Sequence, residues 1–90
     1  MEITYDPAKN SANKAKHGLY LADAEMLDWD TVRIFSDDRR DYGEPRMRGL
    51  GYIGNRLHAV VLVERDDSCR IISLRKANNS ERIAYAKAET

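Results

Sequence analysis

Three apolar-rich runs, separated by turn-forming residues, occupy the second half of the chain. They cover residues 46–53, 57–65 and 70–75, and runs of this length and composition predict strands. Gly54-Asn55 is a two-residue hairpin signal between the first two runs, and Asp66-Asp67-Ser68 marks a turn between the last two. We therefore expect two consecutive hairpins.

Two helices are expected in the first half of the chain. Asp6 is a favourable N-cap before Pro7, and Gly18 ends a predicted helix over residues 7–17. The buried face of this helix is predicted to consist of Ala8, Ala12 and Ala15. A second helix is predicted over residues 20–29, and its buried face should consist of Tyr20, Leu21, Ala24 and Leu27.

The remaining elements are short. Residues 2–5 and 32–35 are predicted strands, and the polar segment 36–45 is predicted to be an exposed loop. A final helix should begin at Asn78 or Asn79, or else at Ser80, and run to about Lys87. The order β-α-α-β-β-β-β-α predicts a single α+β domain over residues 1–90, with an antiparallel sheet, two N-terminal helices and a C-terminal helix, packed mainly against one face.

Charge is distributed unevenly along the chain, although the formal net charge is +0. Residues 1–45 carry six Lys or Arg against ten Asp or Glu, whereas residues 46–90 carry nine against five, and seven of the nine are arginines. This asymmetry predicts a localised anion-binding surface. The alternative is that the arginines flank strands and only keep the protein soluble. One cysteine excludes an internal disulfide framework, and without a membrane-spanning run we expect a cytoplasmic protein.

The first hairpin decides which arginines share a face of the sheet, because strand side chains alternate between faces. If Gly54-Asn55 is the whole loop, Arg48 lies opposite Val61, and Arg46 lies opposite Val63. Arg65 then projects from the same face as Arg46 and Arg48. The other face is predicted to carry the apolar side chains of Met47, Ile53, Val60 and Leu62.

The second hairpin leaves two alternatives. A three-residue loop places Arg75 on the face with Arg65, whereas a two-residue loop brings Arg70 to that face and turns Arg75 away. Either way, at least three guanidinium groups converge on one open face. Guanidinium matches phosphate oxygens bidentately, which favours a polyanion ligand. The alternative is that the arginines form ordinary surface ion pairs with Glu44, Glu64, Asp66, Asp67 and Glu81.

Three groups of residues, in this order, resemble one known family. They are Asp6-Pro7-Ala8-Lys9 with Asn13 and Lys16-His17-Gly18; Glu44-Pro45-Arg46; and Arg70-Ile71-Ile72-Ser73-Leu74-Arg75-Lys76-Ala77 with Glu81-Arg82 and Tyr85. Over about residues 5–85 they are similar to the BrnT family of type II toxin–antitoxin systems; Tyr5 and Leu21 replace the aromatic residues more usual there. The resemblance implies a RelE-like fold, ribonuclease activity that stops translation, and a hetero-oligomer with a small DNA-binding antitoxin of the BrnA type.

RNA cleavage without a metal ion needs a base for the 2′-OH, cations for the phosphate and an acid for the departing 5′ oxygen. The sequence has no cluster of ligands at metal-binding spacing, so we expect neither a metal nor another cofactor. His17 is the candidate for proton transfer, unless it only caps its helix. The candidate catalytic cations are Arg46, Arg65, Arg75 and Lys76. Further substrate contacts are predicted for Arg48, Arg70, Arg82 and Tyr85.

Other roles are open for several of these residues. Tyr85 could pack against the sheet, and Glu81 with Arg82 could form a cap and an ion pair. Residues expected to be structural are His58, Trp29 and Tyr20. Two further functions compete with a ribonuclease: a non-catalytic nucleic-acid-binding module, and a small domain whose sheet receives a protein. Steep salt dependence of nucleic-acid binding would separate the first two from the third.

Overall fold

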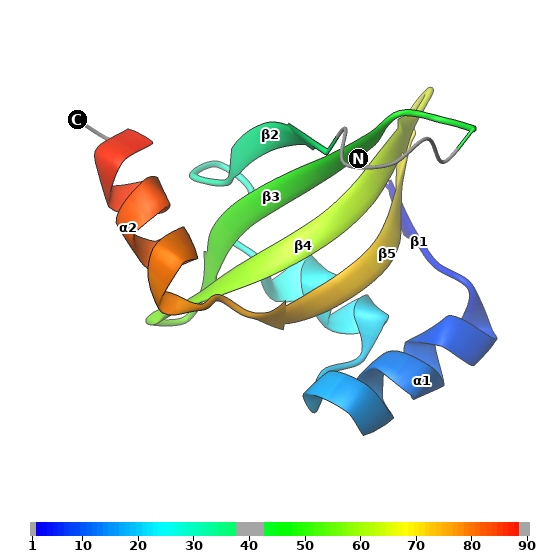
Figure 1. The fold of residues 1–90 in the computed structure, drawn as a ribbon. Coiled ribbons are helices and arrows are strands. Elements are labelled where there is room, and N and C mark those ends of the chain that lie inside the picture. Colours follow the sequence, from blue (N-terminus) through cyan, green and yellow to red (C-terminus); the bar gives the residue numbers. More distant parts are fainter. Residues whose placement is uncertain (1, 38–42, 89–90) are drawn as a thin grey trace.

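The computed structural model describes residues 2–37 and 43–88 (Figure 1). Five strands form one sheet in the order β1-β5-β4-β3-β2. The strands are β1 (Glu2–Thr4), β2 (Arg33–Asp37), β3 (Arg46–Ile53), β4 (Arg56–Arg65) and β5 (Ser68–Lys76). The helices are α1 (Pro7–His17), the 3₁₀ helix η1 (Leu21–Met26) and α2 (Asn79–Ala88). The α+β class and the predicted order of elements are confirmed.

The sheet is mixed, so the prediction of an antiparallel sheet is wrong for one strand. The pairs β2–β3, β3–β4 and β4–β5 are antiparallel, but β1 runs parallel to β5. A tight hairpin forces its two strands to be antiparallel. β1 is separated from β5 by most of the chain, so no turn constrains its direction.

The helices lie on both sides of the sheet, and the prediction of one covered face is also wrong (Figure 1). On one side, Leu21, Ala24 and Leu27 pack with Val60 and other buried residues of β4 and β5. On the other side, Tyr85 of α2 packs in a second cluster with Leu50, Leu57, Ala59 and Ala77. The prediction fails because the strands carry apolar residues on both faces near the first hairpin. The helix α2 covers the apolar residues on the face opposite η1.

The first helix begins and ends where the sequence predicts. The Asp6 carboxylate accepts hydrogen bonds from the N–H groups of Ala8 and Lys9, and Gly18 ends the helix with a left-handed φ of 78°. The predicted alanine face is wrong, because all three alanines are exposed and Asn13 is the one buried residue of α1. Alanine methyl groups contribute little apolar area, so they do not decide how a helix docks.

The second predicted helix forms as the 3₁₀ helix η1. Leu21, Ala24 and Leu27 are three residues apart, and this spacing aligns them on one side of a 3₁₀ helix. All three are buried, whereas Tyr20 is 43% exposed and lies under the Lys14 ammonium, so it is not a core residue. Trp29 packs against the core as expected, and its Nε1 donates to the Ala24 carbonyl.

The boundary between β2 and the following loop also differs from the prediction. β2 extends to Asp37, so the loop expected over 36–45 is shorter, and its residues 38–42 lie outside the described part of the chain. Gly51 lies against the side chain of Val32, and a Cβ at this position would be 2.6 Å from the Val32 Cγ2 atom. In the described residues, no helix is both long enough and apolar enough to cross a membrane.

Candidate active site

The first hairpin has the predicted register. Ile53 pairs with Arg56, so Gly54-Asn55 is the whole loop, and Arg48 lies opposite Val61. Two rows of side chains therefore cross the sheet on the face that also carries α2. One row runs Phe35, Arg48, Val61, Ser73, and the next runs Arg33, Leu50, Ala59, Arg75. Arg48 and Arg75 consequently stand on one face, in adjacent rows and on either side of β4.

The second hairpin combines features of both predicted alternatives. Its loop has two residues, because Arg65 pairs with Ser68. This register brings Arg70 opposite Val63, as predicted for a two-residue loop. Arg75 is nevertheless not turned away. The register shifts between Val61 and Leu62, and the pairs Leu62–Ile71 and Val61–Ser73 leave Ile72 as an additional residue in β5.

This β-bulge restores the alternation for Arg75. Arg70 and Arg75 are five residues apart, so in a regular strand they would face opposite sides. One inserted residue reverses the parity after Ile72. Arg70, Ser73 and Arg75 therefore all project from the face that carries Arg48.

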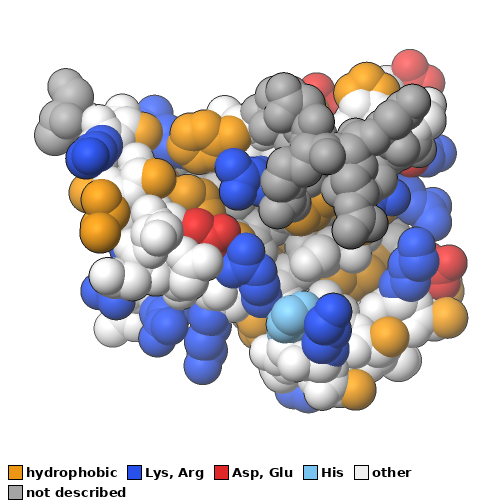
Figure 2. Space-filling model, in the orientation of Figure 1, with side chains coloured by type: hydrophobic (Ala, Val, Ile, Leu, Met, Phe, Trp, Pro, Cys, Tyr) orange, Lys and Arg blue, Asp and Glu red, His pale blue; other side chains and the backbone are white. Residues whose placement is uncertain are grey.

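A groove of about 610 Å³ lies on this face, between the end of α1, the middle of the sheet and the start of α2. We call it the basic groove. Lys and Arg side chains gather around the middle of this face in Figure 2. The ionisable side chains that line the groove are Lys16, His17, Arg48, Arg75 and Glu81. The sheet contributes the floor, and α1 and α2 contribute the two walls.

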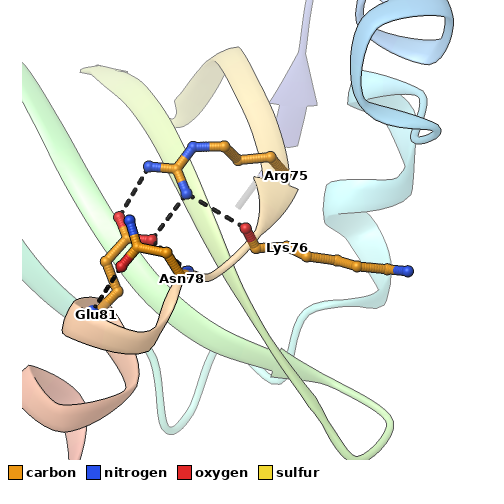
Figure 3. Close-up of polar contacts among 4 residues, drawn as sticks. All are labelled: Arg75, Lys76, Asn78 and Glu81. Carbon is orange, nitrogen blue, oxygen red and sulfur yellow. Dashed lines mark hydrogen bonds and ion pairs between the residues drawn. The ribbon is translucent and has the colours of Figure 1, made fainter.

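Arg75 is held in the groove by a bidentate ion pair with Glu81 (Figure 3). The Nη1 to Oε1 distance is 2.7 Å and the Nη2 to Oε2 distance is 2.8 Å. Glu81 also closes a capping box at the start of α2: its carboxylate accepts from the Asn78 N–H, and its own N–H donates to the Asn78 side chain. One carboxylate thus fixes both the guanidinium and the helix that forms the wall.

Arg48 has an unsatisfied donor. Its Nε is buried and has no hydrogen-bond partner within residues 2–37 and 43–88. The positive charge of Arg48 also acts on Glu81, where it contributes to lowering the pKa of that carboxyl. A buried donor without a partner is costly, and the positive charge of this guanidinium favours an anion in the groove.

His17 is the last residue of α1 and lies at the rim of the groove. Partial burial lowers the pKa of His17 below its ordinary value of 6.5, and the nearby positive charges of Lys16 and Arg75 lower it further. The imidazole is therefore mostly neutral at pH 7. A neutral imidazole that lines the same groove as two guanidinium groups can accept a proton from a substrate hydroxyl.

Comparison with known protein families decides the identity of the chain. A model described as ribonuclease toxin, BrnT, of type II toxin–antitoxin systems matches residues 5–81 of the 90 residues. The chain belongs to the BrnT family. A comparison with curated proteins gave no match. Membership makes this BrnT protein a ribonuclease toxin, with RNA as its target and an antitoxin as its partner.

Four residues predicted for the BrnT site lie away from the basic groove. Lys76 follows Arg75 and pairs with His58, so it lies on the opposite face, and Figure 3 shows its side chain extending away from the ion pair. Arg65 pairs with Glu44, with 3.1 Å between Nη2 and Oε2. Arg82 is exposed on α2 and does not line the groove.

Tyr85 is the fourth, and it is part of the core of this BrnT chain. It is buried, its hydroxyl donates to the Thr31 carbonyl, and its ring meets Tyr52 edge-on. Arg46 and Arg70 occupy an intermediate position, since alternation places them on the groove face but neither lines the groove. His58 is buried on the other face, as predicted, with its Nδ1 2.9 Å from the Arg56 carbonyl.

The groove is also lined by Lys16, Ser73 and Asn78, which were not predicted as site residues. Lys16 precedes His17, so its proximity was available from the sequence. Ser73 reaches the face only because of the bulge. Glu81 was expected as a cap and as an ion-pair partner, and both roles are confirmed. That its partner is Arg75 rather than Arg82 could not be inferred, because a capping-box pattern does not show which cation lies nearby.

Replacing Glu81 with glutamine should lower the free energy of unfolding of this BrnT chain at pH 7 by about 1 kcal/mol, since the side chain loses its charge and one of the two oxygens that accept from Arg75. The hydrogen bond from Arg75 holds the pKa of Glu81 below its ordinary value of 4.5, against the opposing effect of burial. The advantage of glutamate is therefore present above pH 4.5 and lost as pH falls through the lower folded-state pKa. Urea unfolding of the wild type and of Glu81→Gln, from pH 7 to 3, measures this stability difference. A difference in unfolding free energy that does not shrink on acidification would contradict the prediction.

Proposed function

We propose that this BrnT toxin cleaves RNA in the basic groove without a metal ion. The shared lining of the groove by His17, Arg48 and Arg75 carries the proposal, because one groove then holds a neutral proton acceptor and two cations that can bind phosphate. Within the described residues, no group of three or more His, Cys, Asp or Glu is arranged to hold a metal ion. The groove instead offers guanidinium groups for charge stabilisation.

In this mechanism His17 removes the proton of the 2′-OH, and the 2′ oxygen attacks the adjacent phosphorus. The bond from phosphorus to the 5′ oxygen breaks, and the 5′ oxygen takes a proton from water. Arg48 and Arg75 donate hydrogen bonds to the phosphate oxygens, on which negative charge accumulates in the transition state. Glu81 positions the Arg75 fork. Arg46 and Arg70, on the same face, bind neighbouring phosphates of the RNA strand.

The proposal extends to the partner and the fold. The basic groove suits an acidic segment of the antitoxin, because complementary charge accelerates association and blocks the phosphate site. We assign the partner to the BrnA type, a small DNA-binding protein, within a hetero-oligomer that acts in the cytoplasm. The five-stranded sheet, with helices before and after it, supports a RelE-like architecture.

Cleavage in the presence of EDTA tests the metal-independent reaction. The purified chain should cleave RNA at the same rate with and without EDTA, since no step requires a divalent cation. Gel electrophoresis of a labelled RNA measures the rate, and products should carry a 2′,3′-cyclic phosphate. Loss of cleavage in EDTA and its recovery with Mg²⁺ would overturn the proposal. RNA binding without cleavage would favour the non-catalytic alternative.

A further inference from the structure

Hydrogen bonds, rather than apolar packing, hold α1 against the sheet. Asn13 is the one residue of α1 that is buried, with 7% of its surface exposed. Asn10, one turn earlier, accepts a hydrogen bond from the Ala22 N–H, which ties α1 to η1. The position of α1 relative to β5 therefore depends on what Asn13 contacts.

Asn13 contacts the edge of β5 at a point where β1 does not pair with it. β1 has three residues and pairs only with residues 68–70 of β5. Beyond Arg70, on the side away from β4, the backbone of Leu74 is paired with the Asn13 side chain instead. The Leu74 N–H donates to Oδ1 at 3.3 Å, and Nδ2 donates to the Leu74 carbonyl at 2.8 Å. The amide thus acts as one residue of an additional strand.

A third hydrogen bond joins the same amide to the chain beyond α1. Nδ2 also donates to the Leu19 carbonyl at 2.7 Å. Both donors of the amide and its oxygen are therefore used. A side chain bonded at three points is tightly restrained, so α1, its C-terminal turn and β5 are held together at one place.

Both sides of this junction lead directly into the basic groove. His17 is four residues after Asn13, which places it one helical turn away on the same side of α1. Arg75 is the residue after Leu74, and it projects onto the groove face. The Asn13 amide is therefore one residue from Arg75 along β5 and one turn from His17 along α1.

We propose that Asn13 is the positioning residue that sets His17 against Arg75. The inference rests on the proposed roles of His17 and Arg75 in RNA cleavage. Without the Asn13 amide, α1 keeps its tie to η1 through Asn10 but loses its register on β5. His17 then samples positions away from the phosphate that Arg75 holds.

Titration of the His17 imidazole by NMR tests the geometry without RNA. The charged groups that face the groove with His17 are Lys16 of α1, Arg48 of β3, Arg75 of β5 and Glu81 of α2. Since the positive charge of Arg75 lowers the pKa of His17, Arg75→Met should raise that pKa. In an Asn13→Ala background the same substitution should have no measurable effect.

Asn10→Ala is the matched control, because it removes an asparagine of α1 that contacts η1 rather than β5. In this background Arg75→Met should still raise the pKa of His17. In cleavage assays, Asn13→Ala should lower kcat by about 10- to 100-fold, as small misplacements of reacting groups do, with a much smaller change in KM. Asn10→Ala should retain kcat within about threefold, a loss well below that of general-base catalysis.

The outcomes separate this inference from the proposed function. If Arg75→Met raises the pKa of His17 equally in the wild-type and Asn13→Ala backgrounds, the positioning role of Asn13 is overturned. If the rise in pKa is lost in the Asn13→Ala background, the positioning role is supported. Cleavage of RNA by His17→Ala at the wild-type rate would overturn only the catalytic role of His17. If Asn13→Ala does not fold, as judged by circular dichroism, Asn13→Ser is tested by the same criterion.

Discussion

Replacing Arg75 with alanine is expected to slow RNA cleavage by about 100- to 1,000-fold, the range found when one preorganised donor to transition-state charge is removed. The guanidinium lies in the basic groove, where the Glu81 carboxylate fixes its orientation. Its orientation is therefore fixed before charge develops on the phosphate. Single-turnover cleavage of a labelled RNA measures the loss, and growth arrest on expression should disappear in parallel.

Loss of activity must be distinguished from loss of stability in this experiment. Arg75→Ala leaves the Glu81 carboxylate, of which 12% of the side chain is exposed, without its cation. The double variant Arg75→Ala/Glu81→Gln removes that unpaired charge but keeps an oxygen that can accept from the Asn78 N–H. It should therefore be more stable than Arg75→Ala, without regaining activity. Arg56→Ala is the control for charge, since Arg56 is exposed and does not line the groove. Wild-type cleavage by Arg75→Ala would refute the proposed site.

His17→Ala is expected to slow cleavage by about 100-fold or more, the usual contribution of a general base. The base must be neutral, so the rate should rise with pH through the pKa of His17 and then level off. Because that pKa lies below 6.5, the rise should be complete near neutral pH. His17→Ala should lack this rise, and kcat/KM measured from pH 4.5 to 8 tests it.

Lys16→Met provides the control for the His17 assignment. The Lys16 charge contributes to lowering the pKa of His17. Its removal should therefore raise that pKa and move the rise in rate to higher pH, while the plateau is largely kept. A rise that stays at the same pH would show that a group other than His17 supplies the base.

Local signals in the sequence predicted the first hairpin and the ends of α1. A two-residue Gly-Asn turn allows one register, and that register alone places Arg48 opposite Val61. Asp6 and Gly18 determine where α1 begins and ends, through side-chain capping and a left-handed φ. These features depend on residues close in sequence, so they could be predicted without knowledge of the fold.

Contacts between distant residues were predicted poorly. The alanines of α1 resemble a buried face, yet the helix docks through Asn13, because two backbone groups of Leu74 need a partner that an alanine cannot supply. Tyr20 is more exposed than its helical pattern suggests, since η1 begins at Leu21 and Tyr20 lies before it in extended backbone. Lys76 and Tyr85 are close to Arg75 and Glu81 in sequence, but neither side chain faces the groove.

By itself, the sequence determined the element order, the caps of α1, the first hairpin and membership of the BrnT family. Only the tertiary structure decided that Arg70 and Arg75 share a face, because the β-bulge at Ile72 arises from pairing with β4 and leaves no local signal. The tertiary structure also decided that the Glu81 carboxylate pairs with Arg75 and that the Asn13 amide bonds to the backbone of Leu74. Strand and helix periodicity come from the chain, but the partner of a polar side chain is chosen by the surfaces that folding brings together.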